Sequence, residues 1–194
     1  KTVGRWVDDM VVLEPAAMKF ALGENPKKTY SGRNEAPATR MATAALMREQ
    51  LRKALEYAER VAKHEADPEN EDAPDYDAVL EALVPVVQGK LPVHFHAHRA
   101  DDIATALRIA KEFDLDITLD HCTEGHLIAD ELEKEGKGCL VGPTFGAKSK
   151  FELKNKCWDT PKTMVEHGLK TAIITDAPVI PLKYLPLCAG LAIN

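Results

Sequence analysis

Three histidines alternate along a short apolar segment, at His94, His96 and His98. Successive side chains of a β-strand point to opposite faces, so an extended segment here places all three imidazoles on one face. The apolar residues between them then face the other way. Imidazole nitrogen is a preferred ligand of zinc and related metal ions. The pattern therefore indicates a metal site at the carboxyl end of a strand.

Further residues of ligand type occur where other predicted strands run or end, at Lys19, His121 and Asp176. Lys19 lies in an apolar segment, where an unpaired cation is costly to bury. An ion-paired or snorkelling lysine is the alternative interpretation. A single histidine at a strand end also serves often as a structural hydrogen-bonding group. The joint pattern of these residues with the alternating histidines favours a metal site.

The elements that must position these residues alternate along the chain. Short apolar segments predict strands, at 11–22, 91–96, 116–121, 138–142 and 170–176. Amphipathic or apolar segments predict helices, at 41–65, 76–89, 100–113, 124–135, 161–167 and from about 187 to 193. The polar segment 23–39 is predicted to be a functional loop. Strands that alternate with helices in this way indicate βαβ units and a parallel sheet.

The candidate residues fall at the carboxyl ends of four different strands, which is typical of a TIM barrel. The sequence contains no glycine-rich nucleotide-binding motif that would favour a doubly wound sheet. Five strands are too few to close an eight-stranded barrel. The predicted fold class is therefore α/β, a partial (β/α)8 TIM barrel with a parallel sheet and outer helices.

The same segments resemble the amidohydrolase superfamily, in particular imidazolonepropionase-like enzymes and related metal-dependent amidohydrolases. The resemblance rests on MKFALGENPK (18–27), HFHAHRADDI (94–103), LDHCTEGH (119–126) and IITDAP (173–178). It extends over nearly the whole chain and implies approximately strands 4 to 8 of the barrel. In that superfamily a His-x-His pair ends the first strand, yet none precedes Lys19 here. We therefore expect residues 1–194 to be an incomplete domain, without strands 1 to 3 and a small β domain, and inactive alone.

The resemblance also implies roles for individual residues. It makes Lys19, His96, His121 and Asp176 the metal ligands of strands four, five, six and eight. His98 is the alternative ligand of strand five; the histidine that does not ligate would contact substrate or orient the ligand. Glu24 and Asn25 are expected to bind substrate or to lie just behind the ligands.

The implied function is a metal-dependent amidohydrolase that cleaves an amide or cyclic amide C–N bond with metal-activated hydroxide. The expected cofactor is one or two Zn²⁺ ions, with another divalent transition metal as the alternative. A carboxylated Lys19 would bridge two metal ions, whereas an unmodified lysine favours a single ion. Asp176 would be the catalytic acid and base. Two other functions stay open: a non-catalytic metal-binding or scaffold protein on this fold, and an unrelated α/β protein in which these residues are structural.

Charge and composition limit the partners of the chain. The net charge of −6 without a basic patch argues against nucleic acid and membrane surfaces. No apolar run approaches the roughly 20 residues of a membrane span. Four separated cysteines without a CxxC pair indicate reduced thiols and a cytoplasmic location. We expect a small-molecule substrate, and exposed sheet edges predict a homo-oligomer or association with the absent N-terminal part.

Overall fold

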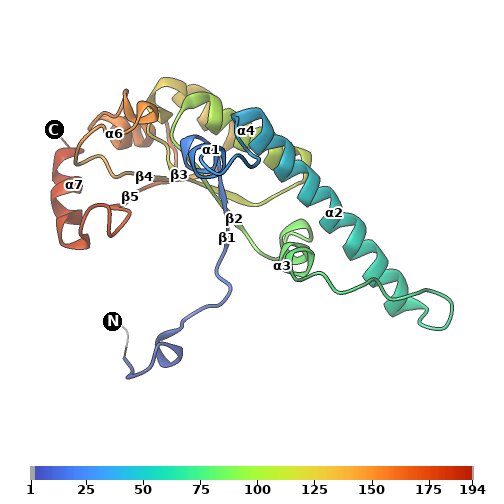
Figure 1. Cartoon of the computed structure of the whole chain (residues 1–194). Coiled ribbons are helices and arrows are strands. Elements are labelled where there is room, and N and C mark those ends of the chain that lie inside the picture. Colours follow the sequence, from blue (N-terminus) through green and yellow to red (C-terminus); the bar gives the residue numbers. More distant parts are fainter. Residues whose placement is uncertain (1–2, 194) are drawn as a thin grey trace.

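Five parallel strands form one sheet in the order of the chain (Figure 1). The structure is a computed structural model that describes residues 3–193. Its strands are β1 (Met18–Ala21), β2 (Val93–Ala97), β3 (Ile117–His121), β4 (Gly138–Val141) and β5 (Thr171–Ile173). Each strand is linked to the next by helical segments, so the predicted α/β fold with a parallel sheet is confirmed.

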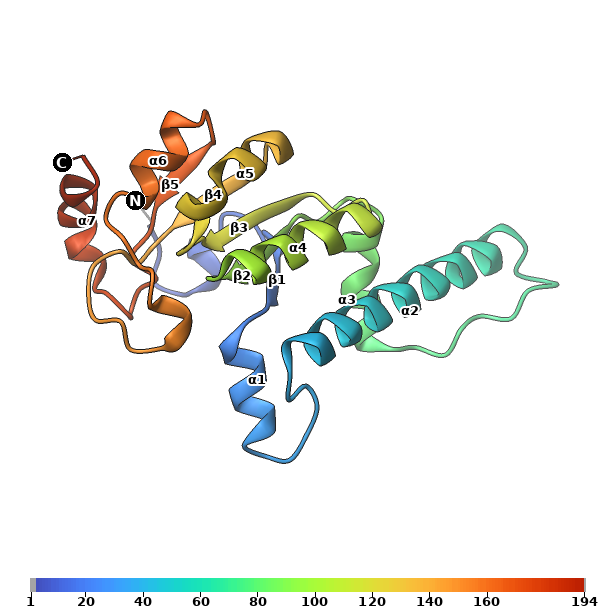
Figure 2. The same cartoon turned by 90° about the horizontal axis from the view of Figure 1, so that it is seen from above.

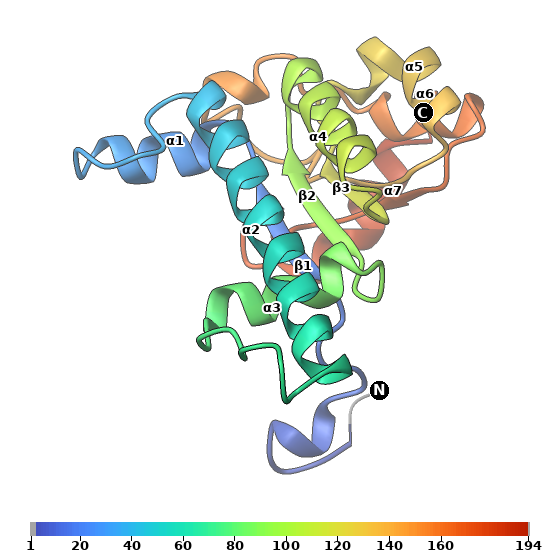
Figure 3. The ribbon, with the colours of Figure 1, turned by 90° about the vertical axis from the view of Figure 1, so that its right-hand side faces the viewer.

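Helices surround the sheet, some beside it and others projecting away from it, as the view from above shows (Figure 2). They are α1 (Glu24–Ser31), α2 (Arg40–Ala66), α3 (Ala78–Val87), α4 (Ala100–Glu112), α5 (Ala129–Glu135), α6 (Thr160–Glu166) and α7 (Leu185–Leu191). The long helix α2 packs against α3 and α4 and runs on past the sheet (Figure 3). Within residues 3–193, no helix combines the length and the hydropathy that a membrane span needs.

The core lies between the sheet and these helices. Val93, Phe95 and Ala97 of β2 are fully buried, and they share a face because side chains alternate along a strand. Helix α4 meets that face with a stripe at helical spacing that includes Ile103 and Ala106. Burial of each large apolar side chain stabilises the fold by about 1.5–3 kcal/mol. Because side chains alternate, His94 and His96 of β2 point to the opposite face of the sheet.

One prediction about the elements is wrong: the segment 23–39 is not wholly a loop, because α1 forms within it. Pro26 lies in the first turn of α1, where a missing N–H is tolerated since the first helical N–H groups have no intrahelical partner. The side chains of Glu24 and Lys28 form an ion pair one turn apart. These local signals outweigh the low hydrophobicity of the segment.

The first and last predicted strands are shorter than expected. Only Met18–Ala21 of segment 11–22 pairs with a neighbouring strand. Pro15 has no N–H for a sheet ladder, and the apolar side chains of Val12 and Leu13 are exposed instead of packed. Strand β5 ends at Ile173, which leaves Asp176 in the loop that follows.

Candidate metal centre

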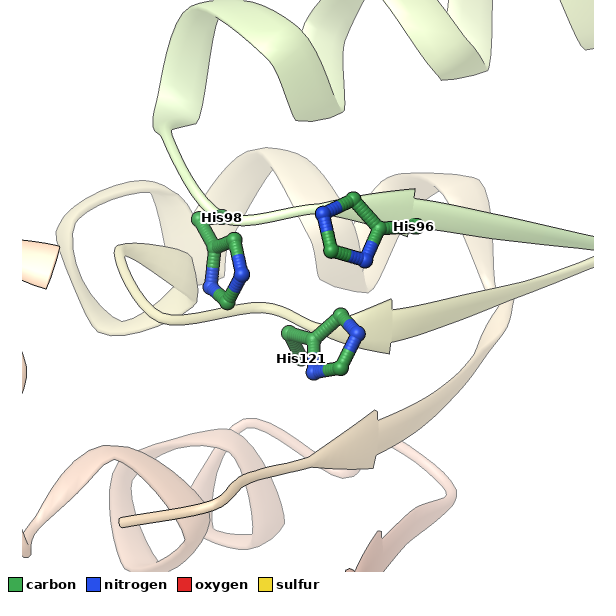
Figure 4. A group of neighbouring side chains, drawn as sticks. All are labelled: His96, His98 and His121. Carbon is green, nitrogen blue, oxygen red and sulfur yellow. The ribbon is translucent and has the colours of Figure 1, made fainter. Parts of the chain in front are cut away.

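His96, His98 and His121 meet at the carboxyl ends of β2 and β3, with their rings turned toward one another (Figure 4). The three ring centroids lie 4.4 to 4.8 Å apart. One ligand nitrogen from each ring lies within 4.8 Å of the other two. The residues are only 8%, 5% and 3% exposed. The structure therefore brings both candidates for the strand-five ligand, and not just one of them, to the ring of His121.

His121 reaches this cluster because the backbone turns at the end of β3. In the sheet register His121 lies beside Ala97, whose side chain faces the core, so simple alternation would bury the imidazole among apolar residues. Instead His121 and Cys122 have φ values of 75° and 43°. This left-handed conformation costs an L-residue about 1–2 kcal/mol. Such strain is characteristic of functional sites.

Hydrogen bonds hold the rings of His121 and His98 in place. The Nδ1–H group of His121 donates to the carbonyl oxygen of Gly142 at 2.7 Å. In the neutral ring the Nε2 atom then carries the free lone pair. On the other ring, Nδ1 of His98 lies 2.7 Å from the hydroxyl oxygen of Thr123. Backbone carbonyls and hydroxyls that orient imidazoles in this way are typical outer partners of metal-binding histidines.

The ring of His96 is held by the side-chain amide of Asn25. Lys150 donates a hydrogen bond to Oδ1 of Asn25, so the amide nitrogen of Asn25 points to His96. Its N–H group donates to Nε2 of His96 at 3.1 Å. Asn25, which follows the first residue of α1, is therefore in direct contact with the histidine cluster.

The buried setting keeps the three rings neutral. Desolvation, followed by the nearby His121, lowers the pKa of His96 to about 3 and that of His98 to about 2. Desolvation also lowers the pKa of His121, although the Gly142 carbonyl and Asp176 oppose that shift. Neutral imidazole is the form that binds metal ions. The Nε2 atoms of His121 and His98 can offer their lone pairs to a divalent transition metal such as zinc, whereas His96 would have to exchange the hydrogen bond from Asn25 for the ion.

Lys19 lies on the same face of the sheet but pairs elsewhere. Its ammonium group forms an ion pair with the carboxylate of Asp120, and its side chain is 55% exposed. Nδ1 of His94 lies 3.1 Å from the other oxygen of that carboxylate. Asp120 is a residue that the sequence analysis missed. The register that places Asp120 beside His96 was the signal, since residues side by side in a parallel sheet share a face.

Asp176 lines a cavity of about 430 Å³ together with Asn25, His96 and His98. It lies in the exposed loop after β5 with φ of 51°. The charge of Asp176 raises the pKa of His121 and so opposes the shift due to burial. Asp176 thus lies in the same cavity as His96 and His98, while the mutually close ligand atoms at this site belong to the three histidines.

Glu24 is buried and does not line this cavity. Its carboxylate accepts a hydrogen bond from the backbone N–H of Glu152 at 3.0 Å, and its own N–H donates to Glu152 Oε2 at 2.8 Å. Gly23 makes this approach feasible, because a Cβ atom there would lie 2.6 Å from Glu152 Oε2. Glu24 therefore fastens the loop between β4 and α6 to α1. Glu152 itself stands alone in a lysine-rich segment, where no periodic pattern could have singled it out.

Comparison with known proteins gives two similar proteins, both described as amidohydrolases; no family model matches the chain. Amidohydrolase tasK from Hapsidospora irregularis is 24% identical over 188 residues, covering 89% of this chain and 19% of the relative. The crystal structure of an amidohydrolase from Thermotoga maritima superposes with a TM-score of 0.90 at 36% identity. That match covers 97% of this chain and 49% of the solved one.

The chain thus spans about half the length of the solved amidohydrolase and about a fifth of the curated relative. The five-stranded parallel sheet with its outer helices accordingly matches part of a TIM-barrel-like domain, and the chain has an amidohydrolase-like fold.

Proposed function

We propose that this chain is part of a metal-dependent hydrolase that cleaves a carbon–nitrogen bond of an amide or cyclic amide. The observation that carries the proposal is the cluster of three buried neutral imidazoles at the carboxyl ends of β2 and β3. The amidohydrolase relatives support the hydrolase class. An imidazolonepropionase-like specificity and Zn²⁺ as the ion are the finer parts of this proposal, and they rest on the sequence resemblance.

In the proposed reaction the chain's own residues hold the ion, orient the substrate and move a proton. His98 and His121, held through Nδ1, would offer Nε2 to the ion, and His96 would join them by exchanging its hydrogen bond from Asn25 for the ion. A bound divalent metal ion lowers the pKa of water and polarises a carbonyl group. Asp176, which lines the same cavity as His96 and His98, accepts the proton of the attacking water and delivers it to the leaving nitrogen. General acid–base action of this kind accelerates a reaction by about 10²–10⁴-fold.

The proposal favours a single ion at the histidines. Lys19 is engaged by Asp120, which supports the interpretation of an ion-paired lysine over that of a bridging ligand. Further ligands in the complete enzyme would come from strands 1 to 3 of the barrel. The absence of these strands from this chain is a prediction from the sequence resemblance. The activity of the whole protein is likewise a proposal, because the chain spans only about half of the solved amidohydrolase.

An activity assay tests the proposal. The complete protein of which this chain is proposed to be a part is loaded with zinc and incubated with N-acetyl amino acids, dipeptides and cyclic amides, because residues 1–194 alone are expected to be inactive. Formation of a free amino group is measured. We expect hydrolysis that a chelator abolishes. We expect Asp176→Asn to lower kcat by about 100-fold or more while metal is retained. The matched control is Asp116→Asn, an exposed carboxylate at the amino end of β3.

The outcomes separate the two functions that a metal site allows. Stoichiometric metal without hydrolysis of any probe supports a non-catalytic metal-binding protein on this fold. Hydrolysis that persists in the presence of a chelator contradicts the metal-dependent mechanism. Equal loss of activity in Asp176→Asn and Asp116→Asn contradicts the assigned role of Asp176.

A further inference from the structure

The cavity beside the histidines has a wall of a different chemical character. That wall is formed by the loop between β4 and α6, and two lysines of the loop, Lys150 and Lys156, line the cavity. Apolar side chains, including Phe145 and Leu153, line it beside them. Among the described residues that line the cavity, Asp176 is the single carboxylate. Asp176 is already assigned to proton transfer, so the lysine wall has a positive charge that the proposed chemistry does not use.

Lys156 is a cation with neutral partners. Its ammonium group donates hydrogen bonds to the carbonyl oxygens of Gly146 at 2.5 Å and Ala147 at 3.2 Å. Within residues 3–193, no carboxylate forms an ion pair with it at 4.0 Å or less. Partial burial, and next the charge of Lys148, lower the pKa of Lys156. A partly desolvated ammonium group without a counter-ion is stabilised when an anion binds beside it.

Lys150 is tied to the reactive end of the cavity. It donates to Oδ1 of Asn25, whose amide contacts His96. The nearest carboxylate oxygen, Oε1 of Glu152, lies 3.7 Å from its ammonium nitrogen. Glu152 is fully buried and is shared with a second cation, Arg40, whose Nη2 atom lies 3.8 Å from its Oε2 atom. Glu152 therefore neutralises the charge of Lys150 only in part, and the ammonium group can still attract an anion in the cavity. Asn25 alone separates Lys150 from His96 of the cluster.

We propose that the substrate has a free carboxylate, which Lys156 and Lys150 bind, next to an apolar side chain that packs in the same cavity. This inference rests on the proposed function in one respect, namely that the same cavity holds the scissile amide. The substrate class is then an N-acyl amino acid or a peptide with its carboxylate near the scissile bond. Neutral cyclic amides are disfavoured, since they leave the two ammonium groups without an anion.

Equilibrium binding of a matched pair of probes tests the inference. N-acetyl-leucine and its neutral amide, N-acetyl-leucinamide, differ only in the carboxylate. Their dissociation constants are measured by calorimetry on metal-free protein, so that a carboxylate–metal bond cannot contribute. We expect the carboxylate to bind about tenfold or more tightly than the amide, the magnitude of a charge-assisted hydrogen bond. Lys156→Gln and Lys150→Gln should each reduce this preference, and the double variant should abolish it.

Lys154→Gln is the matched control, because Lys154 belongs to the same loop but is exposed and lies over the Phe151 ring. It should leave the preference unchanged. Equal affinity for the two probes, absence of binding by both, or a preference that survives in the double variant overturns the inference. Its failure is distinguishable from failure of the proposed function. Absence of metal binding together with a preference for the carboxylate probe refutes only the hydrolase assignment. Metal-dependent hydrolysis without that preference refutes only this inference.

Discussion

The three clustered histidines are neutral because burial opposes their protonation. In the unfolded chain a histidine has an ordinary pKa near 6.5, whereas in the fold the pKa of His96 is about 3 and that of His98 about 2. The unfolded chain therefore binds more protons between these values. The free energy of unfolding must then fall as the pH drops below about 6.5.

Metal-free protein should consequently lose stability between pH 6.5 and pH 5. Each of these histidines contributes a slope of up to about 1.4 kcal/mol per pH unit. Burial raises the pKa values of Glu152 and Asp102, which opposes this trend as the pH approaches their range. Urea unfolding at a series of pH values measures the slope. His98→Gln should reduce the slope of the free energy of unfolding against pH by about the contribution of one histidine. An unchanged slope in this variant would refute a neutral buried imidazole at His98.

A substitution of Lys19 distinguishes a site with one metal ion from a site in which this lysine bridges two ions. Because its ammonium group pairs with Asp120, we expect Lys19→Met to retain the same metal stoichiometry as the unsubstituted chain, at one equivalent. Elemental mass spectrometry after dialysis against zinc measures this ratio. Two equivalents that fall to one in Lys19→Met would instead show that this lysine bridges two ions.

At the scale of elements, the loop between β4 and α6 depends on its junction with α1. Gly23 has φ of 82° and ψ of −144°, a region that is essentially restricted to glycine. The same residue lets Glu152 and Asp102 approach the start of α1. The junction therefore joins a backbone conformation to a close contact, and both would be lost on adding a side chain.

Gly23→Ala should destabilise the protein by more than the about 1–2 kcal/mol of an L-residue in a left-handed conformation. A Cβ atom there would lie 2.6 Å from Glu152 Oε2 and 3.3 Å from Asp102 Oδ2. Gly89→Ala is the matched control, since Gly89 has φ of 68° and nothing within 4 Å of an added Cβ. Urea unfolding compares the two variants. Equal destabilisation would show that the close approach of Glu152 does not matter for stability.

The secondary-structure elements show which site residues could be placed from the sequence alone. Alternation along β2 was sufficient to place His96 on the face away from the core, because strand periodicity is a local property. The position of His121 was not derivable from alternation, since it depends on a left-handed turn after β3. Asp120 and Glu152 were missed because their partners, Lys19 and Glu24, lie about a hundred residues or more away in the chain. Contacts of that kind depend on the sheet register and on loop docking.

At the scale of the whole molecule, the sheet has two strands with an unpaired edge. Within the described part of the chain, β1 pairs only with β2, and β5 pairs only with β4. Unpaired strand edges tend to associate with further strands. We therefore expect the 194-residue chain to self-associate, and sedimentation at tens of micromolar should show species above the monomer. A stable monomer would contradict this expectation.

The most direct test of the account is the metal content of the purified chain and of two histidine variants. His121 lies in the cluster, whereas His94 lies on the same face of the sheet but contacts Asp120. We predict about one equivalent of a divalent transition metal in the unsubstituted chain and in His94→Ala. His121→Ala should lose at least the roughly 10–100-fold in affinity known for residues that merely orient a ligand. Metal bound equally by His121→Ala and the unsubstituted chain, or no metal bound by either, would contradict the assignment of these histidines as a metal centre.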